Sequence, residues 1–227
     1  TGPMYTQLGD ALERASDDES IRVVLLTGTG DCFSAGNDLQ AFMNPADIAP
    51  RIVRFLQLLS TFSKPLVASV PGVAIGIGTT MLLHCDLVYA SDGARFKLPF
   101  VDLGLVPEAA SSLLLPRIVG HPRTSELLLL GETWSAQQAL DAGLINAVLP
   151  QDELQDHAWE RARHLATRAP AALRITKALI ARADAQAVQD TMEAELQEFG
   201  DRLASPELAE AVQAFMERRP PDFSRFS

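Results

Sequence analysis

The sequence predicts an α/β core over residues 1–150, followed by an α-helical region over residues 151–227. Two observations carry this prediction. Before residue 150, short apolar runs typical of buried strands alternate with segments of helical spacing. After residue 151 the strand patterns end, and Ala, Glu, Arg, Leu and Gln dominate. No low-complexity linker separates the two regions, so we expect one continuous unit rather than two independent domains.

The strands of the first region are predicted from apolar, β-branched runs bounded by Gly, Pro or polar residues. Such runs fall at 22–28 ("RVVLLTG"), 66–70 ("LVASV") and 86–91 ("DLVYAS"), with shorter ones at 95–98 and 146–150. Because the first two runs are apolar without alternation, we expect both strands to be buried.

The helices are predicted from apolar residues that recur every three or four positions. Met4, Leu8 and Leu12 show this spacing, and Ser135 with Gln138 forms a capping box at a helix start. A serine followed by proline at 205–206 marks another start. Helices are expected over 4–16, 47–62, 77–84, 108–117, 122–131, 135–142, 152–169, a long stretch to about 199, and 205–217, with an irregular end after them.

The composition excludes several classes of function. A formal net charge of -10 argues against general nucleic-acid binding, because no positive field would attract phosphates. No apolar run approaches the length that spans a bilayer, and the opening residues show no signal-peptide pattern, so we expect no membrane association. Cys32 and Cys85 form no ligand pair and the four histidines match no metal motif. We therefore expect no metal site and a reduced, cytoplasmic compartment.

Two loops after predicted strands are candidates for a site: "FSAGNDL" at 33–39 and "GVAIGIG" at 72–78. Glycines there permit sharp turns, and turns that lead into helices leave backbone N–H groups pointing outward. Two such groups that converge on one oxygen would form an oxyanion hole. The alternative is that these glycines only form turns. The second loop matches neither the dinucleotide-binding fingerprint nor a P-loop.

Taken in order, four segments resemble the successive signatures of the crotonase, or enoyl-CoA hydratase/isomerase, superfamily. They are "VVLLTGTGDCFSAGNDL", "KPLVASVPGVAIGIG", "HCDLVYASDGARFKLPFVDLGLVPE" and "GETWSAQQALDAGLINAVLP". The resemblance covers roughly residues 4–220. It implies a spiral of ββα units whose helical C-terminal region is used in trimerisation, giving a homotrimer or homohexamer. It also implies an acyl-CoA thioester substrate and no cofactor apart from the coenzyme A of that substrate.

Carried over by position, the resemblance implies that the backbone N–H groups of Asn37 and Ile77 are the oxyanion donors. It places further residues at the coenzyme A site: Ala35, Asp38, Leu39, Gly76 and Pro107. The family's opening hairpin, which helps to hold coenzyme A, has no counterpart in this sequence, so its contacts are not assigned. Arg51, Arg54, Arg95 and Lys97 are candidates for the phosphates of coenzyme A, although surface charge explains each of them as well.

The side chains distinguish the members of this family. Hydratases carry two glutamates, at the positions of Thr80 and Phe100, so both carboxylates are missing here. The remaining carboxylate is Glu108 in "LGLVPEAASS", which resembles the single-glutamate Δ3,Δ2-enoyl-CoA isomerases of the peroxisomal type. An isomerase needs one base that removes a proton from C2 and returns it to C4. The alternative for Glu108 is a structural carboxylate in the first turn of a helix.

Three functions therefore stay open: a Δ3,Δ2-enoyl-CoA isomerase with Glu108 as acid and base, a hydratase or other acyl-CoA enzyme of the family, and a non-catalytic coenzyme A-binding scaffold. Glu108 beside two oxyanion turns argues against the third. The acyl chain length depends on how Met43, Phe55, Phe62 and Phe100 pack, which the sequence leaves open.

Overall fold

The structure is a computed structural model that describes residues 1–39 and 45–226. Its strands are β1 (Val24–Thr27), β2 (Cys32–Ser34), β3 (Leu66–Val70), β4 (Val73–Ile75), β5 (Leu87–Ser91), β6 (Arg95–Lys97), β7 (Thr133–Ser135) and β8 (Ala147–Leu149). Its α-helices are α1 (Gly2–Asp17), α2 (Pro45–Ser60), α3 (Ile77–Thr80), α4 (Ser111–Val119), α5 (His121–Leu129), α6 (Ala136–Asp141), α7 (Gln151–Ala166), α8 (Pro170–Ala181), α9 (Ala185–Arg202) and α10 (Pro206–Met216). Short 3-10 helices follow α3 and β6, over Met81–His84 and Val101–Leu103.

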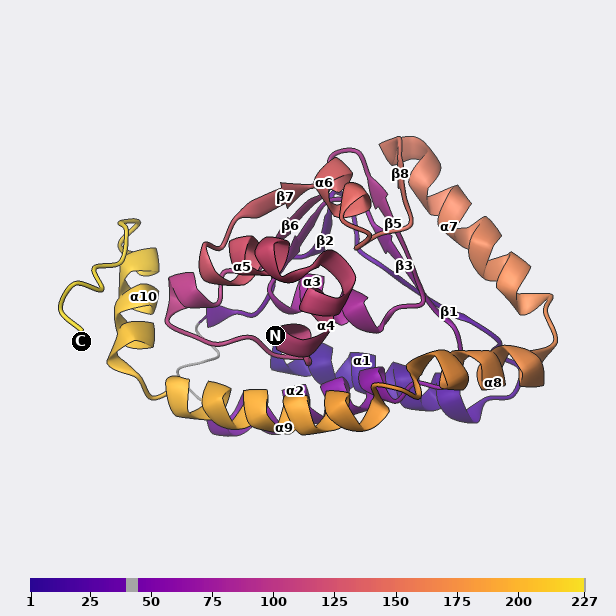
Figure 1. Cartoon of the computed structure of the whole chain (residues 1–227), viewed down its shortest axis with the longest axis horizontal. Coiled ribbons are helices and arrows are strands. Elements are labelled where there is room, and N and C mark those ends of the chain that lie inside the picture. Colours follow the sequence, from indigo (N-terminus) through magenta and orange to yellow (C-terminus); the bar gives the residue numbers. More distant parts are fainter. Residues whose placement is uncertain (40–44, 227) are drawn as a thin grey trace.

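The strands form two sheets, and the chain alternates between them. One sheet has the order β1-β3-β5-β8 and is parallel throughout. The other has the order β2-β4-β6-β7, parallel except for the antiparallel pair β6 and β7. In the first three turns the chain adds one strand to each sheet and then a helix, as in β1-β2-α2 and β3-β4-α3, whereas in the last turn α6 lies between β7 and β8 (Figure 1). This repeat confirms the expected spiral of ββα units.

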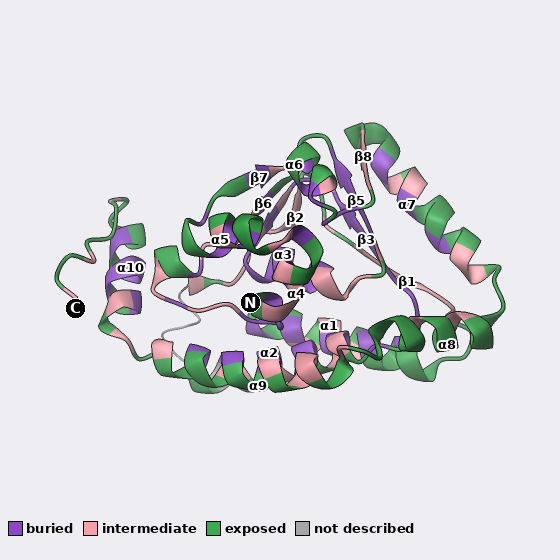
Figure 2. Cartoon of the chain, viewed as in Figure 1, coloured by how far each residue is buried: buried purple, intermediate pink, exposed green. Residues whose placement is uncertain are grey.

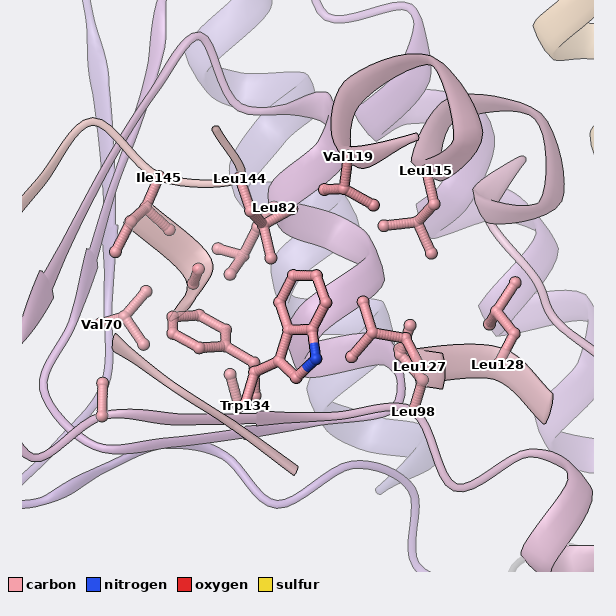
Figure 3. Packing of buried hydrophobic residues seen from close by; sticks show 14 of the residues in the cluster. Val70, Leu82, Leu98, Leu115, Val119, Leu127, Leu128, Trp134, Leu144 and Ile145 are labelled. Atoms are coloured by element: carbon pink, nitrogen blue, oxygen red, sulfur yellow. The ribbon is translucent and has the colours of Figure 1, made fainter. Parts of the chain in front are cut away.

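The core lies where helices cover the sheets. All of β3 is buried, as its continuous apolar run predicts. On the second sheet, Trp134 of β7 lies among Leu82, Leu98 and Leu127, which come from three other segments (Figure 3). Burial of such side chains contributes about 1.5–3 kcal/mol each. This cluster fixes the second sheet against the helices that follow it.

The helices after residue 151 join this core rather than forming one of their own. Leu154 and Ala158 of α7 pack against Val67 of β3. Helix α9 contacts α4, is hydrogen-bonded to the end of α2 through Gln189 and Ser60, and contributes Met192 and Phe199 to the two main core clusters (Figure 1). Helix α8 differs, since none of its residues is buried (Figure 2).

Several predicted elements differ from the structure at their ends. β1 is half-buried rather than buried, because it forms the edge of its sheet. The segment 72–78 contains β4 as well as a turn, and the helix expected over 77–84 changes to a 3-10 helix at Met81. β2, β4 and β7 were not predicted, because strands of three residues are too short to show a pattern. The capping box of Ser135 with Gln138 is confirmed.

The largest correction concerns the helix expected over 108–117. α4 begins at Ser111, and Ala109 and Ala110 before it have left-handed φ angles of 61° and 55°. Glu108 therefore lies outside the helix. The prediction that Glu108 stands in a first helical turn was wrong, because the sequence shows no glycine to mark these two left-handed residues.

Candidate active site

The two candidate loops meet because β2 and β4 are parallel neighbours in one sheet. Their carboxyl ends lie at the same edge, and the loop after β2 faces the start of α3. The approach depends on Gly78, where a Cβ atom would lie 2.8 Å from both the Cβ and the carbonyl oxygen of Ser34. Any side chain at Gly78 would therefore push α3 away from β2.

The structure shows how the two residues expected to supply the backbone donors are held at this edge. Gly76 has φ 56° and ψ -121°, a conformation open to glycine, and its N–H donates to the carbonyl of Lys97 at 2.9 Å. This turn makes Ile77 the first residue of α3, whose N–H has no acceptor within the helix. On the other loop, the Tyr5 hydroxyl donates to Asn37 Oδ1 at 2.6 Å and fixes that residue from α1.

A groove of about 420 Å³ runs along this edge and is mostly apolar. Of the residues expected at the site, Ala35, Asn37, Leu39, Gly76 and Ile77 line the groove. Asp38, Pro107 and Glu108 do not line it. The groove is also lined by two aromatic residues that the sequence did not connect with it, Phe199 of α9 and Phe215 of α10.

The residues expected to set the size of the acyl pocket divide between the groove and the core. Phe100 lines the groove, whereas Phe55 and Phe62 are buried in the cluster beneath α1 and α2. Met43 lies outside the described residues. Among the described residues, Phe100 is thus the member of that set that can contact a molecule in the groove.

The four candidate cations are engaged in different ways. Lys97 lines the groove and forms an ion pair of 3.0 Å with Asp102, which lines it too. Arg54 is paired with acidic residues of α1, Arg95 donates to nearby carbonyl oxygens, and Arg51 donates to Thr6. Lys97 is therefore the one of these four that can contact an anionic group entering the groove.

Glu108 lies behind the groove, buried and 5% exposed. The Thr80 hydroxyl donates a hydrogen bond to Glu108 Oε1. Among the described residues, no group donates to Glu108 Oε2, although this atom is buried. Burial raises the pKa of Glu108 to about 8, the Thr80 hydrogen bond opposes this shift, and the charge of Glu195 adds to it. Glu108 can thus hold or release a proton near neutral pH.

Glu108 interacts with both candidate loops through other residues: through Thr80 of α3 and through Tyr5. Thr80 and Ile77 are three residues apart on α3, so the Thr80 hydrogen bond attaches the Glu108 carboxyl to the short helix whose first residue is Ile77. Tyr5, which holds Asn37, is close enough that the charge of Glu108, after burial, raises the pKa of its hydroxyl. Glu108, Asn37 and the first residue of α3 therefore lie in one region.

Four residues around this region were missed or given no role by the sequence analysis: Thr80, Tyr5, His84 and Glu195. Thr80 entered the sequence prediction only as a position where hydratases of the family carry a glutamate. Tyr5 and His84 carry no signal in the sequence, because their partners lie far along the chain. Glu195 does carry one, since it falls on the apolar face of α9 between Met192 and Phe199.

The sequence profile of the enoyl-CoA hydratase/isomerase family matches residues 2–225, nearly the whole described chain. The chain belongs to the enoyl-CoA hydratase/isomerase family. A crystal structure of an enoyl-CoA hydratase/isomerase from Pseudoalteromonas atlantica T6c has a similar fold, with a TM-score of 0.94 and 46% sequence identity, over 98% of this chain and 90% of that one. This agreement supports the resemblance on which the site residues were assigned.

Relatives in this family differ in their reactions. The mouse (Mus musculus) enoyl-CoA delta isomerase 3, peroxisomal, is 36% identical over 95% of this chain and 70% of its own length. The 2,3-dehydroadipyl-CoA hydratase of Escherichia coli (strain K12) is 37% identical over 97% of this chain and 88% of its own length. Membership of the family indicates an acyl-CoA enzyme. Because the two identities are nearly equal, they do not distinguish an isomerase from a hydratase.

Proposed function

We propose that this chain moves the double bond of a 3-enoyl-CoA to the 2-position, with Glu108 as acid and base. The observation that carries the proposal is the buried carboxyl of Glu108, which the Thr80 hydroxyl ties to α3, the short helix that begins at Ile77. Its raised pKa makes it a stronger base than an ordinary carboxylate, and the apolar groove supplies a dry environment for the reaction.

In this mechanism ionised Glu108 takes a proton from C2 of the substrate. The electron pair of that C–H bond moves to the thioester oxygen and forms a dienolate. The backbone N–H groups of Asn37 and Ile77 stabilise the negative oxygen. Glu108 then gives the proton to C4, the electron pair returns from the oxygen, and the double bond stands between C2 and C3. The proton count is unchanged, so one carboxylate is sufficient.

The same chemistry needs no cofactor apart from the coenzyme A that the substrate carries, since a base and two donors perform every step. Coenzyme A is therefore part of the acyl-CoA substrate in this proposal. The two free thiols, Cys32 and Cys85, support a reduced, cytoplasmic compartment.

The proposal predicts opposite results with two substrates. With 3-enoyl-CoA, the absorbance of the 2-enoyl thioester should rise as product forms. With 2-enoyl-CoA, its loss through hydration should be weak or absent, because Thr80 is not a carboxylate and Phe100 is an apolar side chain in the groove. A rate of hydration comparable with the rate of isomerisation would contradict this assignment.

A second candidate is a hydratase or another acyl-CoA reaction of the family, such as one on ring-derived substrates. The 2,3-dehydroadipyl-CoA hydratase is about as similar to this chain as the delta isomerase is, and this keeps the candidate open. It requires Glu108 to activate water without a second carboxylate at Thr80 or Phe100. A non-catalytic scaffold is the third candidate, and turnover of either substrate would exclude it.

The Thr80 hydroxyl gives a prediction about pH. Its hydrogen bond lowers the pKa of Glu108, so Thr80→Val should raise that pKa above about 8. Because the ionised form is the base, the acid limb of kcat/KM for isomerisation should move to higher pH, with a loss of rate at pH 7. Thr80→Ser keeps the hydroxyl and is the control. An acid limb that stays in place in Thr80→Val would show that this bond does not tune Glu108.

We also propose a homotrimer or a dimer of trimers. The exposed apolar side chains of α8, Ile175, Leu179 and Ile180, are 59%, 60% and 79% exposed, and Phe215 of α10 is 68% exposed. Exposed apolar residues grouped on one helix are typical of a protein interface. Light scattering at micromolar concentration should give a mass of three or six chains. A stable monomer would contradict the proposal.

A further inference from the structure

A second buried carboxylate, Glu195, lies behind the active-site turn. It is on α9, 85 residues from Ala110 in the sequence, and only 7% exposed. Its Oε2 accepts the Ala110 N–H at 2.6 Å, and its Oε1 accepts the Ser112 N–H at 2.9 Å and the Ser112 hydroxyl at 2.6 Å. One side chain thus satisfies two backbone donors at the start of α4, where helices leave N–H groups without acceptors.

The turn that Glu195 binds is strained. Ala109 and Ala110, directly after Glu108, both have left-handed φ angles. This conformation costs an alanine roughly 1–2 kcal/mol, because its Cβ approaches the backbone. A second side chain, the half-buried His84, holds the same turn, since its Nε2 lies 2.8 Å from the Ala109 carbonyl, which can only accept. Two polar side chains from distant elements therefore support two adjacent strained residues.

We propose that Glu195 is a positioning residue for Glu108: by binding Ala110 and Ser112 it maintains the left-handed turn that aims the Glu108 carboxyl at Thr80 and α3. This inference rests on the proposed function of Glu108. Without these hydrogen bonds the strained turn would relax, and Glu108 would leave its place beside Thr80. Both carboxyl oxygens of Glu195 are already bound by Ala110 and Ser112, so Glu195 acts through Glu108 and not on the substrate.

The charge of Glu195 has a separate effect on Glu108. The groups that face Glu108 are Glu195 from α9, Tyr5 from α1 and, behind Ala109, His84. Burial lowers the pKa of His84, so His84 is neutral near pH 7. The negative charge of Glu195 therefore raises the pKa of Glu108 without a facing cation to oppose it among the described groups. Removing this charge should lower the pKa of Glu108.

The variant Glu195→Gln tests whether Glu195 positions Glu108 or only stabilises the fold. The amide keeps one acceptor oxygen but turns its NH₂ toward backbone N–H donors. We expect kcat for isomerisation to fall ~10- to 100-fold, because small displacements of a catalytic group have effects of this size. KM should change little, and the acid limb should move to lower pH. A substitution that only reduced the fraction of folded protein would lower the rate without moving the pH profile. Glu198→Gln, exposed on the same helix, is the control and should behave as the unmodified chain.

A measurement without turnover keeps this test distinct from the test of the proposed function. Carbon-13 NMR of the side-chain carboxyl, assigned by its loss in Glu108→Gln, should give a lower Glu108 pKa in Glu195→Gln. The amides of Ala110 and Ser112 should exchange with solvent faster. If the unmodified chain isomerises nothing, the proposed function fails, while these two readouts still decide the role of Glu195.

If Glu195→Gln does not fold, Ser112→Ala provides a milder test, because it removes only the hydroxyl that donates to Glu195 Oε1. It should reduce kcat several-fold and speed exchange of the Ala110 amide. An unchanged Glu108 pKa and unchanged amide exchange in Glu195→Gln would overturn the proposal, whatever the activity. So would a kcat equal to that of the unmodified chain.

Discussion

Replacing Glu108 by glutamine is expected to lower kcat for 3-enoyl-CoA isomerisation by ~10²- to 10⁴-fold, the usual loss for a general acid–base group. The amide oxygen can still accept the Thr80 hydrogen bond, so the shape of the site is kept. The amide cannot take a proton from C2. The donors at Asn37 and Ile77 are backbone groups and stay in place, so binding of an acyl-CoA should change little. The loss belongs to the transition state and should appear in kcat.

The same variant should change how stability depends on pH. The pKa of Glu108 is about 8 in the folded chain against 4.5 for a free glutamate. Between these values the folded chain binds more protons than the unfolded chain, so the free energy of unfolding falls as pH rises. Glutamine does not titrate and escapes this loss. We therefore expect the Tm of Glu108→Gln to be near that of the unmodified chain at pH 5 and clearly higher at pH 9.

Glu126→Gln, an exposed substitution on α5, is the matched control for both measurements. It should leave kcat and the pH dependence of Tm as they are in the unmodified chain. Near-normal turnover in Glu108→Gln would mean that Glu108 is not the base. A Tm difference that does not grow with pH would mean that its carboxyl titrates as an ordinary one.

The architecture was largely predictable because its elements depend on local patterns. The continuous apolar run of β3 predicts a fully buried strand, and Ser135 with Gln138 predicts the start of α6. β2 and β4 escaped prediction because they are three residues long and are stabilised by each other. Their existence depends on a pairing between distant segments, which no local pattern expresses.

The site was predictable only where it depends on local sequence patterns. The glycine-containing turns, which resemble a family pattern, point to Asn37 and Ile77, and these two residues line one groove. The environment of Glu108 was not predictable, because it is made by contacts across the fold. Thr80 belongs to another ββα unit. Glu195 comes from a helix 85 residues after Ala110 and 83 residues after Ser112, the two residues that it binds. The left-handed pair at 109–110 has alanine where glycine would have signalled the turn.

Gly78→Ala is also expected to lower kcat strongly, because Gly78 lets the two candidate donor loops approach each other. Helix propensity alone would favour alanine on α3 by about 1 kcal/mol. The added Cβ would, however, lie 2.8 Å from the Ser34 carbonyl oxygen, a backbone atom that cannot rotate away. α3 must then move away from β2, and the Ile77 N–H moves relative to Asn37. Losing one donor of an oxyanion hole costs ~10²- to 10³-fold in kcat, and we expect a loss of this size.

Overpacking of this kind also costs about 1–3 kcal/mol of stability, so Tm should fall together with kcat. Gly200→Ala is the matched control, because a Cβ at Gly200 on α9 meets nothing within 4 Å. There the same substitution should raise the free energy of unfolding by roughly 0.5–1 kcal/mol and leave kcat unchanged. Isomerisation by Gly78→Ala at the normal rate would show that the spacing of these loops does not set the oxyanion site. A fall in kcat with normal acyl-CoA binding is the result that the geometry of Gly78 and Ser34 predicts.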